Sequence, residues 1–217
     1  METLSDFAWM NTAIIAFATF FATISPISVA VAFAALTSGD SPWKRRSQAT
    51  KGVVIAAGIM LLFAVTGDKL LIYMGISLPA LRTAGGILLF LIAIDMVFGK
   101  NSGGVTTTDD ENTEAEGKTD ISVFPLATPL IAGPGAIGAV ILLMADSAGD
   151  AVRQFAVLGG LMADLVILFV LLLMATQVQR LLGVTGMTVI TRVMGVLLAA
   201  LAAQFVLDGI AQSGILG

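Results

Sequence analysis

Long stretches without a charged side chain are the feature that most constrains this chain. Residues 7–39 form an uncharged run of 33 positions, and residues 121–145 form another of 25. An α-helix rises about 1.5 Å per residue, so about 20 apolar residues cross the roughly 30 Å hydrocarbon core of a bilayer. Further apolar stretches of suitable length are residues 52–73, 81–98, 155–176 and 188–209. The pattern predicts an all-α polytopic membrane protein with six transmembrane helices.

Composition excludes several other classes of protein. Hydrophobic residues make up 57% and charged residues 12% of the 217 positions, whereas soluble domains carry about 25% charged residues. A soluble enzyme, a disordered chain and a nucleic-acid-binding protein are therefore excluded. Cys and His are both absent, which removes thiolate and histidine nucleophiles and the usual zinc ligands. We expect no cofactor, no metal site and no enzymatic activity.

An acidic linker, residues 100–120, divides the chain into residues 1–99 and 121–217, with three expected helices in each part. A shift of 108 residues, then 110, superposes the two parts. The matching pairs are Pro26 and Pro134, Gly52 and Gly160, Gly75 and Gly183, Arg82 and Arg192, and Gly85 and Gly195. Chance similarity between Leu- and Ala-rich helices is the alternative. Because three helices per repeat is an odd number, a true repeat would give two inverted three-helix repeats, as in secondary transporters.

The distribution of Lys and Arg predicts the orientation in the membrane. Of the 11 basic residues, only Lys69, Arg82 and Arg153 fall on one side of the expected topology. The other eight are Lys44, Arg45, Arg46, Lys51, Lys100, Lys118, Arg180 and Arg192. Since basic residues concentrate in cytoplasmic loops, we expect these eight residues to face the cytoplasm. The location that we expect for this multi-pass protein is the bacterial-type inner (plasma) membrane. The linker is then cytoplasmic, and both termini lie outside the cytoplasm.

Two helix breaks are expected at equivalent positions of the repeats, in the first and fourth helices. The first is Thr23-Ile24-Ser25-Pro26-Ile27-Ser28, and the second is Leu130-Ile131-Ala132-Gly133-Pro134-Gly135. Proline removes a backbone donor and clashes with the preceding turn. The freed groups can be satisfied by a ligand within the membrane: N–H groups at a helix start suit a carboxylate, and free carbonyls suit an ammonium. The alternative is a pair of kinked helices without a ligand.

Polar side chains near the breaks are candidates for contact with a ligand. The hydroxyls of Thr23, Ser25, Ser28 and Thr128 could bind a ligand or return hydrogen bonds to their own helices. Gln204 could bind a ligand or join two helices.

Ionisable side chains inside the bilayer are functional candidates by default. Asp164 lies deepest and is either a neutral buried carboxyl or the carrier of a coupling proton. Arg82 and Arg192 are expected to extend to the interface, with an ion pair to Asp68, Asp95 or Asp164 as the alternative. Asp95 and Asp208 are expected to be solvated. Gly85-Gly86, Gly159-Gly160 and Gly195 are expected to permit close helix packing.

Three motifs carry a resemblance to a known family. The most specific is the run from Pro125 to Ile137, Pro-Leu-Ala-Thr-Pro-Leu-Ile-Ala-Gly-Pro-Gly-Ala-Ile. The others are Gly75-Ile76-Ser77 followed by Arg82-Thr83-Ala84-Gly85-Gly86-Ile87-Leu88-Leu89-Phe90, and Arg192-Val193-Met194-Gly195-Val196-Leu197-Leu198. With these motifs the chain resembles the MarC family over nearly its whole length outside the linker. The resemblance implies a transporter of small neutral amino acids such as glycine and alanine, of the SnatA kind.

One motif departs from that family. Its members commonly have Asn-Pro-(Ile/Leu)-Gly at the first break, where this chain has Ser25-Pro26-Ile27-Ser28. A shorter hydroxyl replaces an amide, which bears on substrate preference.

Together these observations predict a secondary transporter that works by alternating access. A small neutral amino acid would lie between the breaks, where Ala132 and Ala136 limit the size of its side chain. The expected partners are this substrate and the lipid bilayer, with no nucleic acid, and a homo-oligomer is compatible with the sequence. The rival hypotheses are a channel or exporter for another small solute or ion, and an intramembrane enzyme with an aspartate pair. A soft-metal exporter is disfavoured because Cys and His are absent.

Overall fold

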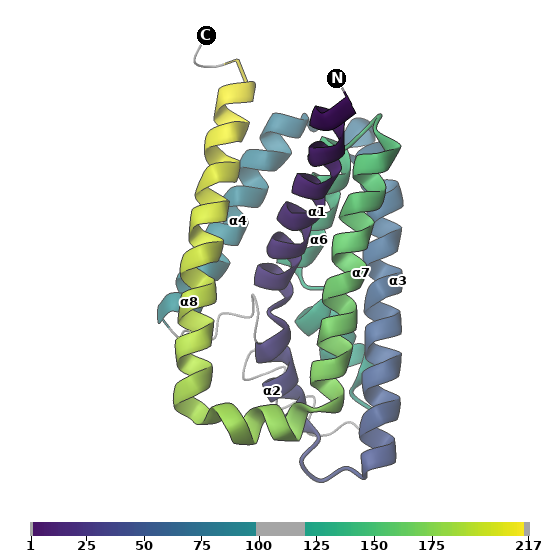
Figure 1. Ribbon diagram of the computed structural model, residues 1–217, viewed down its shortest axis with the longest axis vertical. Helices are drawn as coiled ribbons and strands as arrows, with labels where there is room; N and C mark the ends of the chain where they lie inside the picture. The colour runs from purple at the N-terminus through teal and green to yellow at the C-terminus, as the bar shows by residue number, and fades with distance from the viewer. Residues whose placement is uncertain (1, 99–119, 215–217) are drawn as a thin grey trace.

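The computed structural model describes residues 2–98 and 120–214, and every regular element in these two ranges is a helix (Figure 1). In chain order the helices are α1 (Glu2–Ile24), α2 (Pro26–Leu36), α3 (Pro42–Met74), α4 (Leu78–Phe98), η1 (Ser122–Ile131), α6 (Pro134–Asp146), α7 (Ala151–Leu173) and α8 (Ala175–Gln212). Residues 99–119, which include Lys100, Lys118 and nearly all of the acidic linker, lie outside the described residues.

The helices confirm the predicted membrane crossings. Five spans are long and apolar enough to cross a bilayer: Trp9–Leu36, Pro42–Gly67, Leu78–Phe98, Ala151–Leu173 and Thr188–Gln212. The sixth is the pair η1 and α6, which is bent by 56°. The chain is thus an all-α polytopic membrane protein, and the first and fourth crossings are the broken ones.

The crossings alternate in direction and leave both termini at one end of the bundle (Figure 1). We call this end the terminus end, and we call the opposite end, where α2 leads into α3, the linker end. Helices α1, α4 and α7 run toward the linker end, whereas α3, the η1–α6 pair and the long upright part of α8 return (Figure 1). Each crossing of the first half of the chain therefore runs opposite to the corresponding crossing of the second half. The placement of the terminus end outside the cytoplasm stays a prediction.

Each half of the chain packs its helices against the other half. Helix α1 packs on α7, α3 packs on η1 and α6, and α4 packs along α8. The predicted repeat pairs the first broken crossing with the second, α3 with α7, and α4 with α8. It therefore makes the α1–α7 contact equivalent to the contact of α3 with η1 and α6, and it maps the α4–α8 contact onto itself. The packing is compatible with the repeat predicted from the sequence, which stays a prediction.

Glycines make the closest of these contacts. A Cβ atom on Gly160 of α7 would lie 2.9 Å from the backbone N of Phe17 and 3.2 Å from the backbone O of Ala13, both in α1. A Cβ on its sequence match, Gly52 of α3, would lie 3.2 Å from the backbone O of Ser122 in η1. Each glycine thus lets its helix approach the first half of a broken crossing.

The other glycines named from the sequence divide into two groups. Gly86 and Gly195 lie against backbone atoms across the α4–α8 contact. Gly159 faces open space, and a Cβ on Gly85 would meet only a side-chain atom of Leu142 at an ordinary distance of 3.9 Å. Close packing is thus confirmed for Gly86, Gly160 and Gly195, and the prediction is wrong for Gly85 and Gly159, because these two point away from the neighbouring helix backbones.

Two turns use glycines with positive φ at matching positions. Gly75 ends α3 with φ 68°, and Gly183, 108 residues later, has φ 58° inside α8. At Gly183 the chain turns from a short segment across the linker end into the upright part of α8 (Figure 1). A side chain at such φ values is disfavoured, so glycine is the residue expected at both turns.

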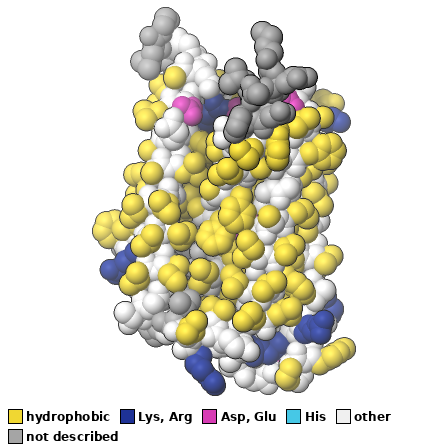
Figure 2. Space-filling model, viewed as in Figure 1, with side chains coloured by type: hydrophobic (Ala, Val, Ile, Leu, Met, Phe, Trp, Pro, Cys, Tyr) yellow, Lys and Arg dark blue, Asp and Glu magenta, His cyan; other side chains and the backbone are white. Residues whose placement is uncertain are grey.

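The surface of the bundle is apolar across its middle. Figure 2 shows hydrophobic side chains over most of this face, with Lys and Arg gathered near its lower, linker end. Exposed examples are Val65, Val166 and Val196, while Phe20, Met60 and Leu161 are fully buried in the interior. Apolar residues on both the inside and the outside are expected of a protein surrounded by lipid.

Candidate functional site

The first predicted break is present at Ser25. This residue has φ 51° and ψ 66°, the left-handed conformation, and Pro26 begins α2 directly after it. A proline disfavours the right-handed helical region for the residue before it, so Pro26 accounts for the interruption of the helix at Ser25. A left-handed serine costs about 1–2 kcal/mol. The chain therefore holds a strained bend at a buried point of its first crossing.

The second predicted break is present at Ala132 and Gly133. Gly133 is extended, with φ −80° and ψ 170°, and Pro134 is the first residue of α6. Gly133, Gly135 and Ala136 are buried, whereas Pro134 is exposed. Both breaks thus end with a proline at the start of a new helix, the position that proline tolerates best.

The segment before the second break is more irregular than the sequence analysis anticipated. Within η1, Phe124 and Thr128 have extended conformations, and each precedes a proline. Backbone hydrogen bonds are still made here, but across five residues rather than four. The N–H of Leu126, for example, donates to the carbonyl of Ile121 at 3.1 Å. The restriction that proline imposes on the preceding residue was the signal that could have identified these two positions.

The two breaks lie side by side. Helix α1 contacts α6 on one side of the breaks, and α2 contacts η1 on the other. Because the two broken crossings run in opposite directions, this pattern places both breaks at the same level of the bundle. Ser25 and Gly133, at the two breaks, are both buried.

A small cavity lies beside the second break. A cavity of about 10 Å³ adjoins Pro134 and Gly135, between α4 and α6. That volume is about what one water molecule requires, so this cavity is too small for an amino acid.

The hydroxyls near the breaks have partners of different kinds. Thr23 donates to the carbonyl of Thr19 at 2.8 Å, and Thr128 donates to that of Val123 at 3.2 Å, so these two bond to their own segments. The hydroxyl oxygens of Ser25 and Ser28 are 2.9 Å apart. Ser28 also reaches Thr191 of α8, at 3.4 Å between hydroxyl oxygens. Thr191, which was not predicted from the sequence, brings the sixth crossing to the first break.

Asp164 is the deepest acidic residue that the structure describes. Its side chain is fully buried in α7, and neither carboxylate oxygen has a hydrogen-bond partner among the described residues. An unpaired charge at such a site is costly, so a proton, a cation or a movement of the helices must be available to it. An intramembrane acid of this kind is a functional candidate.

Arg82 forms an ion pair at the terminus end of the bundle, and its extension to the membrane interface stays a prediction. Its side chain is 8% exposed and its guanidinium bonds to Asp146. Asp146 is the last residue of α6 and was not among the partners considered. Arg153 lies 3.7 Å from the other carboxylate oxygen of Asp146 and donates to Thr12 at 3.3 Å. This cluster joins α1, α4, α6 and α7.

The remaining candidates lie elsewhere. Arg192 is exposed and Asp95 half-buried, and neither has an ion pair within residues 2–98 and 120–214. Gln204 is exposed and donates to Asp208, one turn along the same helix, at 2.8 Å. The structure therefore places Gln204 neither between the breaks nor between two helices, because its amide faces outward.

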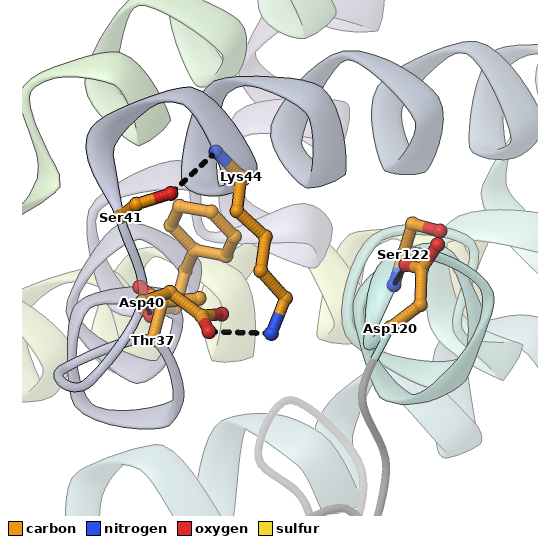
Figure 3. A network of polar contacts seen from close by, with 7 residues as sticks. Thr37, Asp40, Ser41, Lys44, Asp120 and Ser122 are labelled. Carbon is orange, nitrogen blue, oxygen red and sulfur yellow. Dashed lines mark hydrogen bonds and ion pairs between the residues drawn. The ribbon is translucent and has the colours of Figure 1, made fainter.

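The acids described at the linker end have basic partners nearby. Figure 3 shows Asp40 paired with Lys44 at 2.5 Å and Asp120 beside Ser122 at the start of η1. Asp120 also pairs with Lys51 at 3.0 Å. Hydrogen bonds from Ser122, and then from Lys51, lower the pKa of Asp120 to about 2, so this carboxylate remains charged at neutral pH.

Comparison with known proteins agrees with this architecture. The family model described as "MarC family integral membrane protein" matches residues 10–213. A UPF0056 membrane protein of Methanocaldococcus jannaschii is 38% identical over 197 residues, which cover 91% of this chain and 95% of the relative. The UPF0056 membrane protein YvbG of Bacillus subtilis is 36% identical over 194 residues, with 89% and 92% covered. The UPF0056 membrane protein YhcE of Escherichia coli is 34% identical over 194 residues, with 88% and 87% covered. No solved structure matches the chain significantly.

Six crossings, two of them broken side by side, define a multi-pass integral membrane protein with a buried irregular region between its halves. The chain belongs to the MarC family.

Proposed function

We propose that this protein is a secondary transporter of small neutral amino acids, of the glycine or alanine type, that works by alternating access. The observation that carries the proposal is the pair of adjacent helix breaks. Each begins a new helix inside the bundle, where lipid offers no hydrogen bonds to free backbone groups.

The chemistry of helix ends suits a zwitterion. The first N–H groups of α2 and α6 have no partner within their own helices, and these helix starts carry partial positive charge, so they attract a carboxylate. Backbone carbonyls at the ends of α1 and η1 have the opposite polarity and suit an ammonium. The small buried side chains Ala132 and Ala136 leave room for only a small substrate side chain.

Alternating access is supported by the relation between the halves of the chain. The opposite directions of the crossings, the glycine contacts at Gly52 and Gly160 and the positive φ angles of Gly75 and Gly183 fit two inverted three-helix repeats. In such folds one repeat moves against the other around a central site. The Arg82–Asp146 ion pair would hold the terminus end closed in this state.

A labelled-substrate assay tests the proposal. Purified protein in liposomes is expected to take up labelled glycine or alanine saturably, and Gly133→Leu to reduce uptake by more than about tenfold, because a large side chain would fill the buried break. Gly58→Leu is the control, since Gly58 faces open space. No uptake of any neutral amino acid by the folded wild-type protein would refute the substrate class. Flux without saturation would favour the channel hypothesis.

We propose that Asp164 carries the coupling proton. Asp164→Asn, which cannot release a proton, is expected to abolish accumulation driven by a pH gradient while exchange of labelled for unlabelled substrate continues. Asp208→Asn is the control, because Asp208 bonds to Gln204 near the end of α8. Gradient-driven accumulation that survives in Asp164→Asn would overturn the coupling role and leave the substrate proposal intact.

An enzymatic role is not part of this proposal. The intramembrane enzyme hypothesis needs a pair of aspartates, and Asp164 has no hydrogen-bonded acid beside it among the described residues.

A further inference from the structure

A pocket at the linker end gathers three arginines. It has a volume of about 670 Å³ and lies between the start of α3 and the junction of α7 with α8. Arg45 and Arg46 come from α3 and Arg180 from α8; the other lining residues are Pro42, Leu172, Leu173, Thr176 and Gln177. We call it the arginine pocket. It is separate from the helix breaks and plays no part in the proposed transport cycle.

The positive charge of the arginine pocket is not neutralised by the described acids. Arg45 donates to the neutral hydroxyl of Thr176 at 2.7 Å. Asp40 and Asp120, the described acids nearby, pair with Lys44 and Lys51 instead. Within residues 2–98 and 120–214, none of the three arginines has an ion-pair partner.

Helix α3 increases this positive potential. It begins at Pro42, its first turn has no acidic residue, and Lys44, Arg45 and Arg46 follow. A helix start carries partial positive charge, so acids stabilise it and bases do not. An anion bound between these arginines would therefore be attracted both by their side chains and by the start of α3.

The surroundings indicate the source of the anion. Leu172 and Leu173 supply an apolar side of the pocket, and the neighbouring Trp43 is 80% exposed. Tryptophan is enriched at the level of lipid headgroups, and clustered Lys and Arg next to a crossing helix recognise anionic lipids. Guanidinium groups bind phosphate oxygens with paired hydrogen bonds.

We propose that the arginine pocket binds the phosphate of an anionic phospholipid headgroup, with the acyl chains lying along Leu173. The ligand is thus a structural lipid at the end of the bundle that the Lys and Arg distribution assigns to the cytoplasm.

Native mass spectrometry of the full-length protein in detergent can test this site. The wild-type protein is expected to retain phosphatidylglycerol over phosphatidylcholine by about tenfold, and Arg46→Gln with Arg180→Gln to lose that preference. Lys44→Gln with Lys51→Gln is the matched control, because it removes the same charge at the same end but outside the pocket lining. Arg180→Gln alone, a change at an exposed residue, is expected to weaken retention with an unchanged Tm.

Three outcomes would overturn the proposal. If Lys44→Gln with Lys51→Gln lost the preference for phosphatidylglycerol equally, the lipid would be attracted by the general positive charge of the linker end and not by the arginine pocket. Equal retention of both lipids by the wild-type protein would exclude headgroup recognition. Protection of the Tm by millimolar inorganic phosphate, with no additional effect of phosphatidylglycerol, would assign the pocket to a free anion.

Discussion

Gly160→Leu is expected to destabilise the protein severely, and Gly159→Leu is not. A Cβ at position 160 would already lie 2.9 Å from the backbone N of Phe17, and helix α1 cannot yield by rotating a side chain. Overpacking of this kind costs about 3 kcal/mol or more, which corresponds to a fall in apparent Tm of roughly 6–12 °C for a chain of this size. Position 159 faces open space.

The measurement is the apparent Tm in detergent, with alanine, valine and leucine at each of the two positions. At position 160 the apparent Tm is expected to fall further as the side chain becomes larger, and at position 159 it is expected to stay unchanged. Gly52→Ala is expected to be milder than Gly160→Ala, since its closest contacts are with the flexible Leu126 side chain. Equal effects at positions 159 and 160 would contradict the α1–α7 packing described above.

Asp146→Asn is expected to be more destabilising than Arg82→Gln. The change at Asp146 leaves the nearly buried Arg82 without its ion-pair partner, whereas Arg82→Gln leaves Asp146 with Arg153 nearby. Removing one partner of a fully buried pair costs about 3–5 kcal/mol. Because the Asp146 side chain is 40% exposed, we expect a smaller loss, about 2 kcal/mol.

Arg192→Gln is the matched control for this pair. Arg192 aligns with Arg82 in the repeat, yet it is exposed and has no described ion-pair partner. Its substitution is expected to change stability by less than about 0.5 kcal/mol. The double variant Arg82→Gln with Asp146→Asn should recover part of the loss, and strictly additive effects would mean that the two residues are not coupled.

Much of the fold was accessible from the sequence because its signals are local. Uncharged runs fixed the crossings, and the chemistry of Pro26 and Gly133-Pro134-Gly135 located both breaks. The extended conformations of Phe124 and Thr128 also followed from local chemistry, although the sequence analysis did not use it.

The partners of polar side chains were less accessible. Arg82 and Asp146 are 64 positions apart, and their pairing requires knowing that both lie at the terminus end and face each other. The order and direction of the crossings are enough to predict that the two residues lie at the same end of the bundle. The Ser28–Thr191 contact and the outward direction of Gln204 could not be read in this way, since they depend on how α2 and α8 are rotated about their axes.

The sequence by itself determined the class of protein, the number of crossings and the positions of the breaks, because a bilayer selects for apolar length and proline acts on its own turn. The tertiary structure decided which face of each helix meets its neighbours. In a soluble protein the contrast between apolar and polar faces reveals this, but here lipid-facing Val166 and buried Leu165 are equally apolar. Rotation is therefore set by close contacts at residues such as Gly160 and Gly86, which become apparent only when the helices are assembled.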